Sequence, residues 1–198
     1  MTLNMLIGIL EQGLIYGIMA MGLLITYRIL DFPDLTVDSS FPLGAAVSAT
    51  LTLQGVAPWL TLLIGCAAGG IAGLITGLIH VKCRVRDLLS GIITMTGLYS
   101  INLHIAQNKA NLPLFGGDTL FRNAFTKSLP KAISPYTTLI IIFLIALIAK
   151  ILLDLFLRTK CGYLLRAAGD NPSVVTTLSR DQGTVKILGL IIANALVA

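Results

Sequence analysis

Long uninterrupted apolar runs constrain this chain more than any other feature of its sequence. The candidate membrane-spanning runs cover residues 4–27, 40–53, 58–79, 88–106, 135–157 and 184–198. Backbone groups in lipid must bond within the protein, so a span is either a helix or part of a closed barrel. Barrel strands alternate apolar with polar residues, whereas these runs are continuous. We therefore predict an all-α, polytopic transmembrane helical bundle.

The last run determines how many spans we expect. It offers about fifteen residues, whereas a helix needs about 20 apolar residues to cross a bilayer. We therefore expect five spans plus a truncated sixth, with residues 1–198 forming a single transmembrane domain that is cut short at its C-terminus. The second run is also short, and a polar stretch precedes it.

Composition supports a membrane protein and argues against other classes. The chain is 56% hydrophobic and 12% charged, and that charged fraction is about half of what a soluble domain carries. The net charge of +5 comes from basic residues in loops, with no basic patch interleaved with aromatics, so we expect no nucleic-acid partner. Three cysteines without a spacing pattern, Cys66, Cys83 and Cys161, indicate neither a disulfide framework nor a metal site.

Lysine and arginine positions predict the orientation in the membrane. Two spans separate two strongly basic segments, so both segments lie on one side, which the positive-inside rule makes the cytoplasm. The 107–134 loop is then external, although it also carries four basic residues. The basic residues of the two cytoplasmic segments are Lys82, Arg84, Arg86, Arg158, Lys160, Arg166, Arg180 and Lys186.

The third run carries glycines at every fourth position. Small residues at this spacing line one helix face and allow a second helix to approach closely. We predict helix packing through this face, with a glycine hinge as the alternative. The four residues are Gly65, Gly69, Gly73 and Gly77.

The polar stretch 31–42 precedes the short second run and carries three carboxylates. Pro33 and Pro42 should prevent a regular helix through both ends. One interpretation is a broken helix lining a transport path, because non-helical backbone at membrane depth survives only inside protein or beside water. The other is a hydrated loop followed by a Pro-started helix, and a metal site is weaker because no further ligand joins the aspartates. The path-facing candidates are Asp34, Thr36, Asp38, Ser39 and Ser40.

The fourth run carries a polar seam that includes Thr94, Thr96 and Asn102. Serine and threonine in helices commonly bond to carbonyls of their own helix, which is the expected role for most of the seam. Asn102 is the exception that we add to the translocation path, because an amide at that depth usually faces protein or a cavity.

The 158–183 segment is too polar to span, yet apolar residues punctuate it. Gly169 is suited to end one short helix, and Asn171 with Pro172 are suited to begin another. Val174, Val175 and Leu178 would then share one face of a short amphipathic helix. Such a helix either docks into a groove on a partner or lies in the headgroup layer.

These residues resemble ATP-binding-cassette (ABC) transporter permeases of the branched-chain amino acid and ribose importer class. The stretch Gly162-Tyr-Leu-Leu-Arg-Ala-Ala-Gly-Asp-Asn-Pro, followed by Leu178, is similar to the family's segment between later spans. The resemblance implies that residues 158–183 couple the permease to its ATPase, with Arg166, Gly169, Asn171, Pro172, Val174, Val175 and Leu178 as the contact residues. The 31–40 stretch departs from the Asn-Phe-Ala-His-Gly-like sequence of relatives and is closer to a subgroup linked to aromatic amino acid uptake.

The resemblance also implies partners: ATPase subunits inside, an extracytoplasmic solute-binding protein outside and a second permease copy in the bilayer. No Walker-type motif and no catalytic set are present in the sequence, so we expect a non-enzymatic transport subunit without cofactors or metals. It would move a small solute, which we expect to be an amino acid, inward across a bacterial-type cell membrane. The alternative is an ion- or proton-coupled secondary transporter, which needs an intramembrane charge near the midplane.

Overall fold

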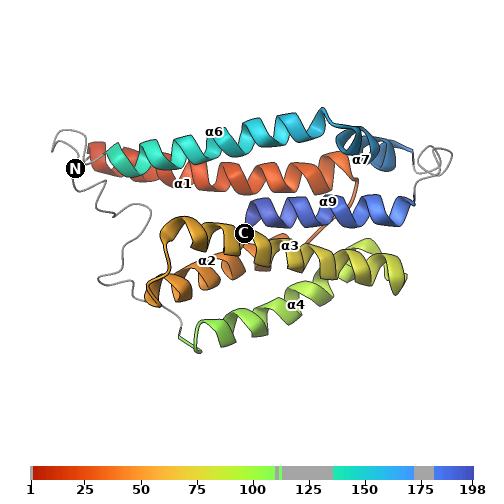
Figure 1. The fold of residues 1–198 in the computed structure, drawn as a ribbon, viewed down its shortest axis with the longest axis horizontal. Helices are drawn as coiled ribbons and strands as arrows, with labels where there is room; N and C mark the ends of the chain where they lie inside the picture. The colour runs from red at the N-terminus through yellow and green to blue at the C-terminus, as the bar shows by residue number, and fades with distance from the viewer. Residues whose placement is uncertain (1, 110–111, 113–135, 172–180) are drawn as a thin grey trace.

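A computed structural model describes residues 2–109, 112, 136–171 and 181–198, and the described residues form helices joined by short segments (Figure 1). In chain order the helices are α1 (Thr2–Leu23) with its π-helical extension η1 (Leu24–Ile29), α2 (Val37–Leu53), α3 (Pro58–Lys82), α4 (Asp87–Ile105), α6 (Thr137–Leu157), α7 (Lys160–Asp170) and α9 (Gln182–Val197). The prediction of an all-helical chain is confirmed for these residues.

Four helical stretches are long and apolar enough to cross a membrane: Met5–Ile29, Pro58–Lys82, Asp87–Ile105 and Thr137–Leu157. Each agrees with a predicted run to within a few residues. The 17-residue α2 and the 16-residue α9 are shorter, so the expected count of five spans plus a sixth stays a prediction. Residues of the 107–134 loop beyond 109, apart from 112, lie outside the described residues.

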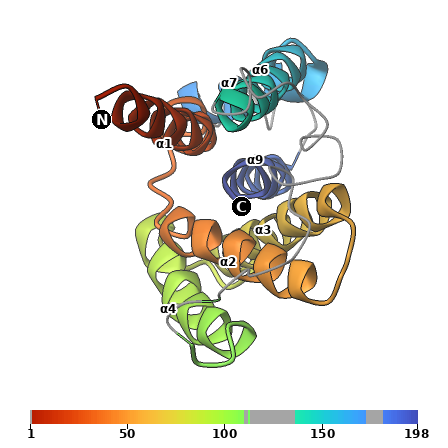
Figure 2. The ribbon, with the colours of Figure 1, turned by 90° about the vertical axis from the view of Figure 1, so that its left-hand side faces the viewer.

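The bundle is built around α9. Figure 2 shows α9 between a pair formed by α1 and α6 and a layer formed by α2, α3 and α4. Much of the surface of α1 and α6 is apolar and exposed, including the side chains of Phe143 and Leu144 on α6. Apolar patches this extensive mark contact with lipid or with another protein.

The glycine face of α3 lies against α9. A methyl group on Gly69 or Gly73 would collide with backbone carbonyls of α9, and one on Gly77 would come within 2.9 Å of Ile187 Cγ1. Gly65 lies farther off, with Gly44 and Ala198 as its nearest neighbours. Because α3 is a continuous helix through all four glycines, it is unbroken at the alternative hinge positions.

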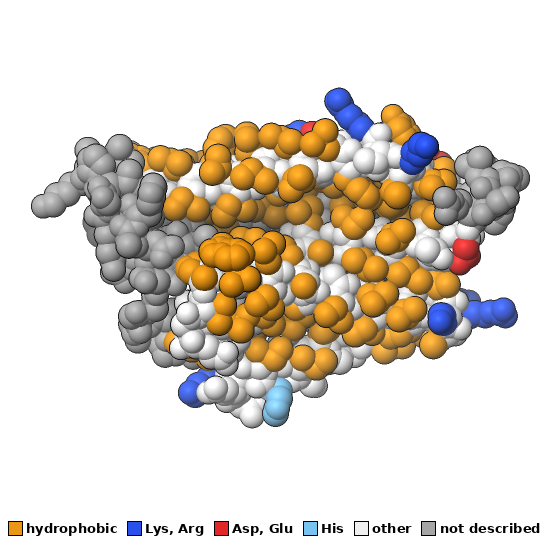
Figure 3. All heavy atoms as spheres, in the orientation of Figure 1, with side chains coloured by type: hydrophobic (Ala, Val, Ile, Leu, Met, Phe, Trp, Pro, Cys, Tyr) orange, Lys and Arg blue, Asp and Glu red, His pale blue; other side chains and the backbone are white. Residues whose placement is uncertain are grey.

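Most of the described basic residues gather at one end of the bundle, which we call the basic end, whereas Lys109 follows α4 at the opposite end. The basic end contains the end of η1, the turn between α3 and α4, the end of α6, all of α7 and the start of α9 (Figure 1). Figure 3 shows Lys and Arg side chains protruding there beyond a largely hydrophobic face. The two predicted basic segments therefore share one end, as the count of spans between them required.

A core of buried apolar side chains joins the elements at this end. Ile25 and Leu30 from the end of the first span pack with Leu165 of α7 and with Val185 and Leu190 of α9. The core therefore connects the α7 segment, the first span and α9 into one unit.

Candidate functional site

The chain leaves helical geometry after the first span and runs back into the bundle. Residues 31–36 are not helical, and Phe32, Asp34 and Thr36 are at most 1% exposed. The burial of these three side chains contradicts the interpretation of the stretch as a hydrated loop, although Asp31 is exposed and Pro33 and Leu35 are partly exposed. Irregular backbone of this kind is tolerated at membrane depth where protein buries it.

Helix α2 begins inside the bundle rather than at a surface. Ser39, in its first turn, donates a hydrogen bond from Oγ to the Met95 carbonyl at 3.0 Å, and Met95 lies in the middle of α4 (Asp87–Ile105). The N-terminus of α2 is thus at mid-height of its neighbour. Discontinuous helices with ends at this depth are typical of transporter binding sites.

The predicted effect of Pro42 on this helix is wrong. We expected α2 to begin near Ser40, but it begins at Val37 and continues through Pro42. Proline removes one amide donor, which would have bonded to the Asp38 carbonyl four residues earlier. Both Asp38 and Pro42 are exposed, so the loss falls on the outer face of the helix and leaves the buried face intact.

A buried polar network holds the start of α2. Asp34 Oδ1 accepts from the Thr36 backbone N–H at 2.9 Å, and Asp34 Oδ2 accepts from Asn194 Nδ2 at 2.8 Å. Asn194 Nδ2 also donates to the Leu190 carbonyl, and its Oδ1 accepts from Ser40 Oγ at 2.6 Å. The Asn194 amide therefore has partners on both its nitrogen and its oxygen.

The network extends to the glycine helix. Thr36 Oγ1 and Thr76 Oγ1 are 2.8 Å apart, and Thr76 Oγ1 donates to the Ala72 carbonyl at 3.2 Å. Since the Thr76 proton is directed to that carbonyl, Thr36 is the donor between the two hydroxyls. All these side chains are at most 1% exposed, so the network ties α2, α3 and α9 together inside the protein.

Asp34 is a buried carboxylate without a salt bridge to any described cation. Burying a charge is costly unless hydrogen bonds replace water. Two donors face its oxygens, and the N-terminus of α2 presents the positive end of the helix dipole beside it. This arrangement fits a carboxylate that positions backbone.

Asp38 has a different environment from Asp34. It lies in the first turn of α2 and is exposed, on the same outer face as Pro42. Asp31 is also exposed, at the basic end, where its φ of 50° places it in the left-handed region. The three aspartates form no metal-binding cluster, and the part of the chain that the structure describes holds none.

The polar seam of α4 divides as expected. Thr94 and Thr96 donate to carbonyls of their own helix at 3.0 Å and 2.9–3.0 Å. Asn102 instead donates from Nδ2 to the Ser39 carbonyl of α2 at 3.0 Å. Its Oδ1 is buried and has no partner among the described residues, so a spare acceptor lies beside the start of α2.

Gly169 does not end a helix, which corrects the sequence-based expectation. Helix α7 continues to Asp170, and its C-cap residue Asn171 has an extended backbone. The predicted start of another helix at Asn171 and Pro172 leads into residues outside the described part of the chain and stays a prediction. A methyl group on Gly169 would collide with the Ile29 carbonyl and approach the Leu30 backbone. The glycine is needed for close approach of two backbones, not for a left-handed cap.

The remaining predicted coupling residues divide between two parts of the chain. Arg166 is exposed on α7. Pro172, Val174, Val175 and Leu178 lie outside the described residues. Through Gly169 and Leu165, α7 contacts the residues that lead into the 31–36 segment, so part of the predicted coupling segment adjoins the predicted path.

Sequence reasoning missed Thr76 and Asn194, which complete the buried network. Asn194 is an amide within an apolar run, and a polar side chain in a span is a signal of internal contact or function. Nothing comparable distinguished Thr76, because threonine in a helix is normally satisfied by its own backbone.

Two hollows lie among the described residues, and the predicted path residues line neither. One is apolar, about 1180 Å³, between the α1–α6 pair and the α2–α3 layer. The other is about 400 Å³ and lies at the basic end between the α3–α4 turn and the start of α9.

Comparison with known proteins gives the family. Residues 5–198 match the family described as "Branched-chain amino acid transport system / permease component". The chain belongs to this permease family. With its apolar spanning helices, it is a multi-pass membrane protein and a member of a transport family.

Curated relatives extend the comparison. The chain is 43% identical over 193 residues to a "Tyrosine transport system permease protein" of Clostridioides difficile (strain R20291), covering 98% of the chain and 61% of the relative. It is 34% identical over 196 residues to an uncharacterised protein of Rickettsia prowazekii (strain Madrid E), covering 99% and 66%.

A more distant relative carries a different substrate in its name. It is the "Probable branched-chain amino acid transport permease protein LivH" of Methanocaldococcus jannaschii, 29% identical over 199 residues, covering 95% of the chain and 62% of the relative. The chain thus spans less than two thirds of the length of these relatives. No solved structure matches it significantly.

Proposed function

We propose that this chain is part of the permease subunit of an ABC importer, and that the start of α2 lines its translocation path. The observation that carries the proposal is Asp38, a carboxylate exposed on the outer face of α2 next to Ser39, which contacts the middle of α4. A charge at that depth is costly against lipid. The outer face of α2 therefore faces water or another protein, as a transport path between permease copies requires.

Polar groups at the start of α2 suit a substrate with a positively charged end. Asp38 provides a carboxylate, and its carbonyl lacks the helical donor that Pro42 removes. Asn102 Oδ1 is a buried acceptor without a described partner nearby. These acceptors fit the ammonium group of an amino acid, and tyrosine is the first substrate to test, because the name of one relative specifies it.

The buried network would act as the fixed support of this path. Asp34, Thr36 and Ser40 bond to α3 and α9 rather than projecting outward. In our proposal they position the α2 N-terminus, while Asp38 and Asn102 contact the substrate.

Coupling to ATP hydrolysis would pass through α7. We place the basic end in the cytoplasm by the positive-inside rule, with the ATPase docked on the 158–183 segment. Movement of α7 would reach the 31–36 segment through the contact of Gly169 with Ile29 and Leu30. A second permease copy would complete the path, and a solute-binding protein would deliver the substrate at the opposite end.

The proposal is tested by reconstituting the permease in proteoliposomes with a candidate ATPase and a candidate solute-binding protein from the same organism. We expect tyrosine uptake that requires ATP and the binding protein. Uptake that proceeds without the ATPase would overturn the importer mechanism, and stable association of the permease with an ATPase of another substrate system would redirect the choice of substrate.

A proton-coupled transporter is the second candidate, because Asp34 is a carboxylate buried within the bundle and Asp38 is another at similar depth. It predicts uptake driven by a proton gradient in liposomes that contain the permease alone. The same preparation discriminates the two mechanisms, since the importer should be inactive there.

A further inference from the structure

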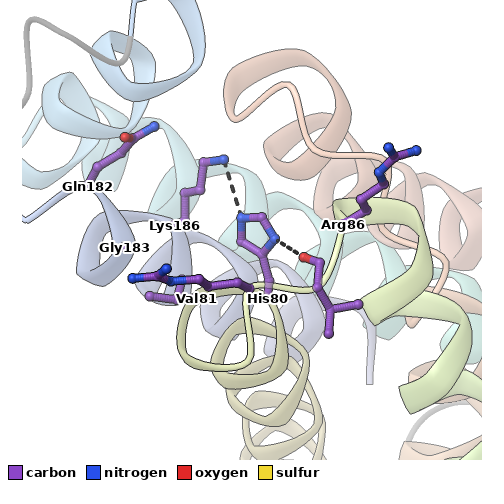
Figure 4. Close-up of a pocket in the computed structure, with 8 residues that line it drawn as sticks. His80, Val81, Arg86, Gln182, Gly183 and Lys186 are labelled. Carbon is purple, nitrogen blue, oxygen red and sulfur yellow. Dashed lines mark hydrogen bonds between the residues drawn. The ribbon is translucent and has the colours of Figure 1, made fainter.

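The hollow at the basic end is lined by cationic side chains from two separate parts of the sequence. Arg84 and Arg86 come from the turn between α3 and α4, and Lys186 comes from the first turns of α9. His80 lies between them, at the end of α3 (Figure 4). The hollow has a volume of about 400 Å³, which is within the range of small-ligand sites.

None of the described residues that line this hollow carries a carboxylate. Its other lining residues are Val81, Val85, Gln182 and Gly183. Within the described ranges, Arg84, Arg86 and Lys186 form no salt bridge. The nearby acids have partners other than the three cations: Asp87 Oδ1 lies 3.1 Å from Nδ1 of the lining residue His80, and Asp181 accepts from the lining residue Gly183 N–H and from Thr184 Oγ1.

His80 holds Lys186 in place over the hollow. His80 Nδ1 lies 2.9 Å from the Val85 carbonyl, which can only accept, so Nδ1 carries the proton. His80 Nε2 is then an acceptor, and Lys186 Nζ donates to it at 3.4 Å (Figure 4). The ring edge also contacts Phe32, with ring centroids 5.2 Å apart. One of the three cations is therefore oriented by a packed side chain rather than free in solvent.

Arg84 occupies a backbone conformation that disfavours it. Its φ of 53° lies in the left-handed region, where glycine is favoured and a long side chain is strained. Strain of this kind persists at binding sites, where the side chain has a use that glycine cannot supply. The positive-inside rule accounts for a positive charge on this turn but not for its presence at a strained position.

An apolar surface adjoins the hollow. Leu88 and Leu89, which directly follow the α3–α4 turn on α4, are 49% and 50% exposed, and Leu188 of α9 is 43% exposed. Figure 3 shows Lys and Arg side chains at the edge of a broad hydrophobic face of the molecule. A hollow at the edge of a lipid-facing surface lies at the depth of the membrane's headgroup layer.

We propose that this hollow binds the phosphate of an anionic phospholipid, with the acyl chains along the adjoining aliphatic side chains. Guanidinium groups bind phosphate oxygens in pairs, and lysine contributes a point charge. Basic pockets between spans on the cytoplasmic side are suited to such headgroups. The inference rests on the membrane location of the chain and not on the transport mechanism.

An acidic surface of a partner protein is the competing occupant. The lipid is favoured because exposed leucines flank the cations, and an apolar flank suits acyl chains better than it suits a charged protein surface. The lipid also satisfies both parts of the surface at once, the hollow and the aliphatic side chains beside it.

The test counts lipids bound to the purified permease by native mass spectrometry, with phosphatidylglycerol, phosphatidylcholine or inorganic phosphate added to detergent micelles. We expect phosphatidylglycerol to bind and to raise the unfolding temperature, and the other two to do neither. We expect phosphatidylglycerol binding to weaken about fivefold in each of Arg84→Gln, Arg86→Gln and Lys186→Gln. One cation near the headgroup layer raises the affinity for an anionic lipid by about that factor.

Two variants serve as controls. Lys82→Gln removes an exposed charge from the same turn but lies outside the lining residues, so it should leave phosphatidylglycerol binding unchanged. Arg84→Gly removes the charge and the strain together, so binding should weaken while the lipid-free protein becomes no less stable. This pair separates loss of the site from loss of the fold.

The proposal is overturned if Lys82→Gln weakens binding as much as Arg84→Gln, since the attraction would then be diffuse. It is overturned if inorganic phosphate binds as tightly as the lipid, or if phosphatidylcholine binds equally well. Loss of ATPase association in the three variants with unchanged lipid binding would assign the hollow to a protein partner instead.

Discussion

Asn194 Nδ2 donates a hydrogen bond to Asp34 Oδ2 at 2.8 Å, across 160 residues of sequence. The contact joins α9 to the non-helical segment that leads into α2, and both side chains are at most 1% exposed. Because Asn194 also accepts from Ser40, a single amide bonds both to the non-helical segment and to the first turn of α2.

Replacing Asn194 with alanine should destabilise the protein by about 1–3 kcal/mol, because a buried carboxylate loses a donor that no water replaces. Asp34→Asn should also destabilise, since its single oxygen can accept from only one of the two donors and its NH2 group faces the other. Thermal unfolding of purified variants in detergent measures both changes. The matched control is Thr94→Val, which removes only a bond to the variant's own helix; equal losses in all three would contradict the assigned role of Asn194.

The glycine face of α3 yields a second prediction. Gly73→Ala should destabilise the bundle by about 1–3 kcal/mol, because the added methyl group collides with the Leu190 carbonyl of α9 in a packed interface. Gly97 of α4 has no atom within reach of an added methyl group, so Gly97→Ala should stabilise by about 0.5–1 kcal/mol through helix propensity. We therefore expect the free energy of unfolding to fall in Gly73→Ala and to rise in Gly97→Ala.

Asp38→Asn tests the translocation path. The side chain is exposed and carries no hydrogen bond on which the described fold depends, so stability should change by less than about 0.5 kcal/mol. Uptake into proteoliposomes should fall at least tenfold, because the substrate ammonium loses its counter-charge. Asp31→Asn is the control. It removes an exposed carboxylate at the basic end, and asparagine tolerates the left-handed backbone conformation at this position. Undiminished uptake in Asp38→Asn would remove Asp38 from the path.

Gly169→Ala tests the contact between α7 and the first span. The methyl group would push α7 away from the Ile29 carbonyl, so we expect ATPase binding to persist while transport per ATP hydrolysed falls several-fold. Cys161→Ala, an exposed position on the same helix, should leave that ratio unchanged. A parallel fall in binding and transport would instead indicate that α7 itself is misplaced.

Local patterns predicted the helices because their causes are local. The apolar runs located every described helix except the polar α7 to within about three residues, since a span needs continuous apolar length wherever it packs. The glycine spacing of α3 and the shared side of the basic segments were readable for the same reason: both depend on helical period and span count.

The details of the break between the first span and α2 were less accessible. Pro33 and Pro42 indicated interrupted helix, but the rule that proline stops a helix failed at Pro42 because the missing bond falls on an exposed face. Gly169 indicated a helix end, but its lack of a side chain serves a close backbone contact with Ile29. A glycine that ends a helix and a glycine that allows two backbones to approach look the same in the sequence.

The amino-acid sequence alone established a helical membrane protein of the permease family with a basic end. Tertiary packing decided which polar groups meet: Asn194 with Asp34, Thr36 with Thr76, and Lys186 with His80. The physical reason is that helical periodicity is encoded within a few residues, whereas a hydrogen-bond partner is selected by which helices lie side by side. That selection spans up to 160 positions here, beyond the reach of any local pattern.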